Sequence, residues 1–254
     1  MINIMQKYLT NKIKPNYPYY KFIILNTSKY IYEIIDILKD VIGECEVVSY
    51  EGYSVIFYFN NVDFDFKSLI KTINDDFYID AHLFESGKIQ FNDGSEFHQL
   101  LDIYNKANLQ KYTYSSNKNI IKYLTRNSTL AKELAPIVLN KMIKDESLLI
   151  LANQMFECDL NISLTAKSTY MHRNTVNYKL GQIKEETDLD IRCFKDAVIM
   201  YEFLKKIWLK FLGLYSRIFN FVHFAHRFNF DYLIQWYCKK LFCAKEEIYG
   251  NCNT

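Results

Sequence analysis

A run of polar and basic residues opens one predicted helix. The stretch 170–183 reads YMHRNTVNYKLGQI, in which polar residues precede an apolar series with helical spacing. At about 100° per residue, Val176, Leu180 and Ile183 share one narrow stripe, so the polar side chains point away from it. Asn174, Thr175, Asn177 and Tyr178 form this polar face, with Arg173 and Lys179 on its flanks, and the face is free to contact a partner. The candidate DNA-binding residues are His172, Arg173, Asn174, Thr175, Asn177, Tyr178 and Lys179.

These side chains suit the base edges and phosphates of duplex DNA. Arg173 can donate two parallel hydrogen bonds to guanine, and Asn174 or Asn177 can pair with adenine. Hydroxyl and ammonium groups can bind phosphates and so fix the register of the protein on the duplex. Thr175, Tyr178 and Lys179 carry such groups. Backbone N–H groups at the start of the helix add phosphate contacts. The pattern predicts a helix whose first turn enters the major groove.

A second, shorter helix must position the first. The residues SLTAKST, 163–169, predict this helix, and the small Ala166 with Leu164 allows a close crossing. Tyr170 and Met171 supply a tight connection. Two helices joined in this way form a helix-turn-helix, in which the second helix reads the DNA.

The remainder of the second half is also predicted to be helical. Apolar residues repeat at helical spacing in three further segments, 120–143, 145–159 and 190–208. Asp145 and Glu146 begin the second of these segments, where acidic side chains favour the positive end of a helix.

The first half alternates between strand and helix patterns. Gly52 follows Glu51 between two β-branched and aromatic runs, which predicts a hairpin, and Ser28 is a candidate N-cap for the first helix. The predicted order is βαββαβ, with elements at 20–25, 28–43, 44–50, 53–59, 64–77 and 78–84. This order is typical of a ferredoxin-like sheet with both helices on one face, and 95–109 adds a helix behind it.

The fold class is therefore α+β, a ferredoxin-like domain followed by an all-α helix-turn-helix domain. Residues 111–119, KYTYSSNKN, are polar and predict a linker. The predicted divisions are an N-terminal segment, a sensory or dimerisation domain, this linker, a helical domain and an aromatic-rich tail, at 1–19, 20–110, 111–119, 120–204 and 205–254.

The segment 165–192, TAKSTYMHRNTVNYKLGQIKEETDLDIR, resembles the C-terminal helix-turn-helix of the PucR and CdaR transcriptional regulators. In that family a His-Arg-Asn-Thr run opens the recognition helix, and residues 172–175 match it in order. Tyr178 and Lys179 match the usual aromatic and basic pair, with Lys in place of the commoner Arg. Thr169 stands where the family usually has Leu, which implies looser packing between the two helices.

The resemblance covers 148–204 well and the helices from Ile120 onward loosely, and it implies a DNA-binding regulator with an N-terminal sensory part. Members of the CdaR branch carry a degenerate GGDEF-like domain there, in agreement with the βαββαβ order. A working diguanylate cyclase has acidic residues at the hairpin where this chain has Tyr53 and Ser54. Cyclase or phosphodiesterase chemistry is therefore not expected, and the chain is predicted not to be an enzyme.

RNA binding is the alternative function. The stretch EGYSVIFYF, 51–59, resembles the RNP1 strand of RNA-recognition motifs, which share the βαββαβ order and stack bases on sheet aromatics. Glu51 replaces the expected basic residue and Val55 takes a stacking position, so this interpretation is the weaker one.

Composition limits the other classes. Lys and Arg total 31 against 29 Asp and Glu, a formal charge of +2, so any signal for nucleic acid must be local. The start MINIMQKYLTNKIKP lacks an apolar signal core, and no run of about 18 apolar residues follows, which predicts a cytoplasmic protein without a membrane partner. The six cysteines lack a C-x-x-C pair and are interpreted as free thiols.

No cofactor or metal is predicted. His82 and His98 have no convergent partners for catalysis, and the spacing of the tail residues His223, His226, Cys238 and Cys243 matches no metal-site pattern. The partners expected are double-stranded DNA, a second copy of the chain in a homodimer, and a small-molecule effector. The aromatic tail and the sheet are the candidate dimer interfaces.

Overall fold

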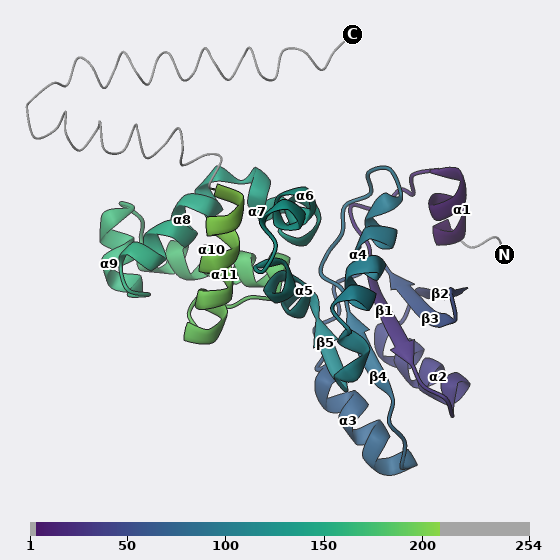
Figure 1. Ribbon diagram of the computed structural model, residues 1–254. Helices are drawn as coiled ribbons and strands as arrows, with labels where there is room; N and C mark the ends of the chain where they lie inside the picture. Colours follow the sequence, from purple (N-terminus) through teal and green to yellow (C-terminus); the bar gives the residue numbers. More distant parts are fainter. Residues whose placement is uncertain (1–3, 209–254) are drawn as a thin grey trace, which may run out of the picture. The chain divides into compact units, whose positions relative to one another are not determined.

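The computed structural model describes residues 4–208, and residues 4–206 belong to one compact unit. The tail beyond it, with its histidines and cysteines, lies outside the described residues. A five-stranded sheet occupies the N-terminal half, in the order β2-β3-β1-β4-β5 (Figure 1). The strands are β1 (Lys21–Asn26), β2 (Cys45–Tyr50), β3 (Tyr53–Tyr58), β4 (His82–Glu85) and β5 (Tyr114–Ser116).

The first four strands confirm the predicted βαββαβ order and the α+β class. Helix α2 (Ile31–Ile42) joins β1 to β2, and α3 (Phe66–Phe77) joins β3 to β4. Strand β3 pairs antiparallel with both β1 and β2, and β4 pairs antiparallel with β1, as in a split βαβ sheet. The hairpin turn lies at Glu51 and Gly52, which have φ of 48° and 84°, the left-handed pair that a two-residue type I′ turn requires.

Helices α2 and α3 cover one face of the sheet, as predicted. Buried residues from both helices pack with the strand residues that point the same way, and this core contains Ile23, Leu25, Ile34, Ile35, Leu38, Ile42, Ile56, Tyr58, Phe66, Ile70, Ile73, Ala81 and Leu83. Asp65 caps α3, because its side chain accepts a hydrogen bond from the backbone N–H of Ser68 at 3.1 Å.

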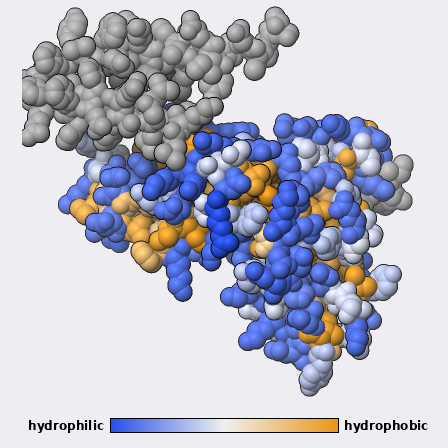
Figure 2. All heavy atoms as spheres, in the orientation of Figure 1, coloured by the Kyte–Doolittle hydropathy of each residue, from blue (hydrophilic) through white to orange (hydrophobic). Residues whose placement is uncertain are grey.

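The opposite face of the sheet is also covered. Helix α4 (Ser95–Lys106) lies on it, and Phe97 packs edge-on against Phe22 and Phe57 with ring centroids 5.1 and 5.2 Å apart. Helix α1 (Ile4–Asn11) adds Tyr8, whose ring packs against Phe91. The outer surface in Figure 2 is mainly hydrophilic. Phe22, Phe57 and Phe84 of the sheet are buried, and Tyr53 is half-buried against α4, so α4 covers the aromatic face on which bases would stack.

Three sequence predictions for this half need correction. Tyr30, with φ of 56°, and not Ser28 holds the N-cap position of α2, because Thr27 Oγ1 bonds both backbone groups of Lys29 and closes a turn before the helix. The last predicted strand, 78–84, begins only at His82, because the Asn74 amide pairs with the backbone of Ala81 and holds the preceding residues against α3.

The third correction concerns 111–119, which is not an irregular linker. Its residues 114–116 form β5, which pairs parallel with β4, and the next residue begins α5. A short 3-10 helix, η1 (Leu109–Lys111), leads into it. The position of the domain boundary stays a prediction.

The second half is helical, as predicted, but 120–143 is divided. Asn127 caps a new helix by accepting hydrogen bonds from the N–H groups of Thr129 and Leu130. Asn140, at φ of 47°, lies between this helix and the next one. The helices are α5 (Asn117–Leu124), α6 (Ser128–Val138), α7 (Lys141–Lys144), α8 (Glu146–Glu157), α9 (Ile162–Ser168), α10 (Arg173–Thr187) and α11 (Phe194–Trp208). Within residues 4–208, no helix has the length and apolar character needed to cross a membrane.

Candidate nucleic-acid interface

Helices α9 and α10 form the predicted helix-turn-helix, supported by α8 (Figure 1). The stripe of Val176, Leu180 and Ile183 is at most 1% exposed, so the apolar face of α10 is buried as its spacing predicts. Thr169, expected to loosen the packing, donates its hydroxyl to the carbonyl of Thr165 at 2.7 Å. The hydroxyl at this departure from the family pattern is therefore satisfied within α9.

The turn between α9 and α10 contains Tyr170, which the sequence predicts only as part of the connection. Tyr170 has φ of 53°, a conformation that costs an L-residue roughly 1–2 kcal/mol, and its side chain is 98% exposed. Lys167, in the last turn of α9, is also exposed. Both residues precede Arg173 in the sequence, and this proximity is the signal by which they could be added to the candidate set.

The start of α10 presents three of the candidate DNA-binding residues to solvent. Arg173, Asn174 and Thr175 are all exposed, and together they make up the first turn. Tyr178 follows one turn later and is 68% exposed, whereas Asn177 is half-buried. The first turn and Tyr178 therefore form one continuous polar surface.

His172 and Lys179 of the predicted set have hydrogen-bond partners close to the two helix starts. His172 is the N-cap of α10, because its Nδ1 accepts a hydrogen bond from the backbone N–H of Asn174 at 3.2 Å. Lys179 Nζ donates to Ser147 Oγ at 2.6 Å, at the start of α8. The Ser147 hydroxyl, aided by backbone N–H groups and Lys179, lowers the pKa of the α8 cap Asp145. The Lys179–Ser147 contact joins α10 to the start of α8.

The DLDIR motif that follows α10 also has a structural role. Arg192 donates two hydrogen bonds to the Asp190 carboxylate, at 2.7 and 2.8 Å, and this pairing lowers the pKa of Asp190. Leu189 and Ile191 of the same motif are buried. The motif therefore anchors the connection from α10 to α11.

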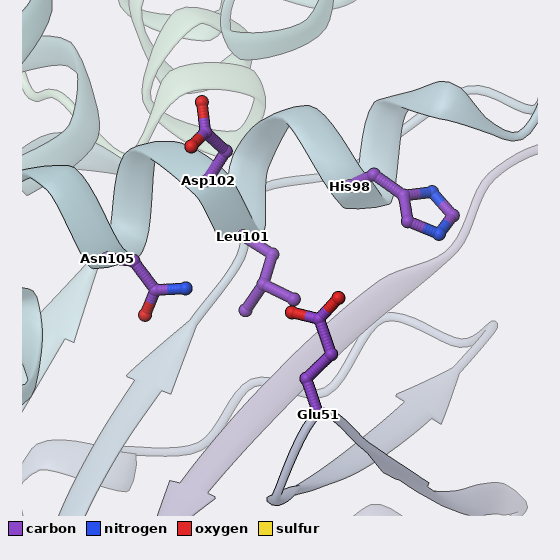
Figure 3. A pocket seen from close by; sticks show the side chains of 5 residues that line it. All are labelled: Glu51, His98, Leu101, Asp102 and Asn105. Carbon is purple, nitrogen blue, oxygen red and sulfur yellow. The ribbon is translucent and has the colours of Figure 1, made fainter.

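The sheet domain has a small polar cavity of about 220 Å³ between its hairpin turn and α4. In Figure 3, Glu51 extends from the turn toward Leu101, with Asn105 and His98 on either side and Asp102 pointing away. His98 Nδ1 lies 3.1 Å from the carbonyl oxygen of Gly94 on its own helix. Among the residues that the structure describes, no three His, Cys, Asp or Glu side chains are placed to hold a metal ion.

A known domain family and individual proteins are similar to parts of this chain. Residues 148–201 match the PucR C-terminal helix-turn-helix domain. A stretch of 45 residues, 18% of this chain, is 36% identical to the uncharacterized protein YxkF of Bacillus subtilis (strain 168) and spans 15% of that relative's length. The crystal structure of a regulator of polyketide synthase expression from Bifidobacterium adolescentis is similar with a TM-score of 0.36 and 15% identity, over 76% of this chain and 81% of that one.

Proposed function

We propose that this chain, whose residues 148–201 are a PucR-type C-terminal helix-turn-helix domain, is a sequence-specific DNA-binding transcriptional regulator. The observation that carries the proposal is the first turn of α10, where Arg173, Asn174 and Thr175 are exposed above a fully buried apolar stripe. A solvated helix face needs no such concentration of side chains suited to base edges.

The residues of the polar surface take different roles in this proposal. Arg173 reads guanine and Asn174 reads adenine in the major groove, because their side chains can make bidentate contacts. Thr175 and Tyr178 contact phosphates and fix the register. His172 acts through its cap, which fixes the start of the helix, and Lys179 reaches a phosphate only by sharing its ammonium group with Ser147. Lys167 and Tyr170 extend the phosphate contacts onto the turn.

The sheet domain is proposed to act as a non-catalytic sensor of a small-molecule effector. Its hairpin carries Tyr53 and Ser54 where cyclases hold their metal ions, and Tyr53 donates a hydrogen bond to Asn105 at 2.8 Å. The tyrosine is thus part of the packing between the hairpin and α4. Its GGDEF-like character remains an interpretation.

Replacing Arg173 or Asn174 by alanine should weaken binding to the best operator by roughly 1–3 kcal/mol and relax discrimination at particular base pairs. A lost base contact changes specificity, whereas a lost phosphate contact, as in Lys179→Ala, reduces affinity for all sequences and lowers the salt slope by about one ion. The measurement is a salt titration on a selected duplex and on a scrambled one.

Val176→Ala is the structural control for this experiment. Because the Val176 side chain is buried, its truncation should lower the melting temperature of the domain. Arg173→Ala and Asn174→Ala should leave the melting temperature nearly unchanged. If Arg173→Ala and Asn174→Ala both fold and both keep full specific binding, α10 does not read DNA.

A homodimer is proposed because one helix-turn-helix buries too little surface for a tight operator complex. Two copies should read half-sites about one helical turn, or a multiple of it, apart. Analytical ultracentrifugation of the free and DNA-bound protein measures the assembly. A chain that stays monomeric at micromolar concentration on its best operator would contradict the dimer.

A further inference from the structure

The C-terminal turn of α10 is held by residues from the sheet domain. The Glu185 carboxylate forms an ion pair with Lys88, in the loop after β4, with Nζ and Oε1 2.5 Å apart. The same oxygen accepts a hydrogen bond from Asn61 Nδ2, after β3, at 3.3 Å. Lys88 is itself held in place, because its ammonium group lies 5.1 Å from the ring centroid of Tyr19 and only 11% of its side chain is exposed.

A buried amide holds the final carbonyl of the same helix. The last four carbonyls of a helix lack partners within it, and the Thr187 carbonyl accepts a hydrogen bond from Asn117 Nδ2 at 3.3 Å. This amide also donates to the Val138 carbonyl at 3.0 Å, and the residue is only 3% exposed. The loop after β4 closes over it, since a Cβ on Gly87 would lie 3.0 Å from Asn117 Nδ2.

Glu186, which lies between Glu185 and Thr187, also has a partner outside α10. Asn140 Nδ2 donates to Glu186 Oε2 at 2.8 Å, and both residues are buried. Three consecutive residues of α10 are thus bound by different parts of the chain, and we call Lys88, Asn117 and Asn140 the C-terminal clamp. Its members lie outside the segment 148–201 that matches the helix-turn-helix domain.

The clamp and the DNA-reading turn lie at opposite ends of one helix. At about 1.5 Å per residue, Glu185 is roughly 18 Å along the axis from Arg173. A tilt of about 10° at the clamp would move the reading end by roughly 3 Å, close to the spacing of successive base pairs. A small change of helix orientation at the clamp would therefore be large enough to move Arg173 by about one base pair.

We propose that Lys88 is a positioning residue for DNA reading, which through Glu185 sets the angle at which α10 enters the major groove. The inference rests on the proposed function of α10. It assigns the sheet domain a direct mechanical influence on operator choice, because Lys88 and Asn61 belong to that domain and contact the same carboxylate.

The test compares Lys88→Met with Lys106→Met in the full chain. Both substitutions remove one positive charge and keep an unbranched side chain, but Lys106 pairs with Asp102 on α4 and is 54% exposed. The measured quantity is the ratio of affinities for a selected and a scrambled duplex, together with the melting temperature. Lys88→Met should lower the ratio by about fivefold or more, in the range of measured couplings, while Lys106→Met leaves it unchanged.

Exchanging the two charges separates positioning from general stability. The double variant Lys88→Glu, Glu185→Lys restores an ion pair at the same place, so it should recover most of the lost ratio. Equal ratios for the two methionine variants would overturn the inference, as would a loss that follows the melting temperature and is not recovered by the exchange. A wild-type chain that does not distinguish the two duplexes would instead overturn the proposed function.

Discussion

Phe97→Ala is expected to lower the free energy of unfolding by about 3–5 kcal/mol, the range for removing a buried phenylalanine ring. The ring is fully buried and packs edge-on against Phe22, Phe57 and Tyr50 from three strands. No rearrangement of a single neighbour can fill a space bounded by three strands, so a cavity should remain. Guanidinium unfolding followed by far-ultraviolet circular dichroism measures the change.

Phe64→Ala is the matched control for this measurement. Its side chain is 45% exposed and contacts Phe66 beside α3, so its removal should cost less than about 1 kcal/mol. Equal midpoints for the two variants would show that α4 does not close the second face of the sheet. In that case the sheet aromatics would again be open to other partners.

Asn117→Ala should lower the free energy of unfolding by about 2–3 kcal/mol, because two buried carbonyls lose their donor at once. Water cannot readily replace the amide as a donor to the Val138 and Thr187 carbonyls, because Asn117, which bonds both, is only 3% exposed. Thermal and guanidinium unfolding should both report the loss.

Asn105→Ala provides the comparison for this second substitution. Its amide oxygen accepts one hydrogen bond from Tyr53 at an exposed position, where water can take over. A change within about 0.5 kcal/mol is expected. If Asn117→Ala is equally mild, the amide does not hold α10 and the C-terminal clamp reduces to its ion pair.

The sequence predicted those elements whose pattern and partners are local. Gly52 in the hairpin and the alternating runs beside it specify the turn, and the stripe of Val176, Leu180 and Ile183 specifies the buried face of α10. His172 is a candidate DNA-binding residue because it opens the polar run that resembles the family's recognition helix. Its use as a cap depends on a ring orientation that spacing does not reveal.

The missed features depend on contacts between distant residues. Tyr114, Ser115 and Ser116 have no strand pattern of their own, and they become a strand only because β4 offers an unpaired edge. Lys179 was expected to face a phosphate, but its partner Ser147 lies on another helix. In the sequence, Asn117 cannot be distinguished from other polar loop residues. Its hydrogen-bond partners, the Val138 and Thr187 carbonyls, are distant along the chain.

Strand β5 also bears on how this architecture can be recombined. The segment that completes the sheet runs directly into Asn117, so one short stretch serves both halves of the chain. A fragment ending at residue 110 would leave the edge of β4 unpaired, and strands of other chains could then pair with it and cause aggregation. A fragment beginning at residue 120 would lose the amide that binds the end of α10. Exchanging the sheet domain for another at this junction would therefore require β5 and Asn117 to be kept together.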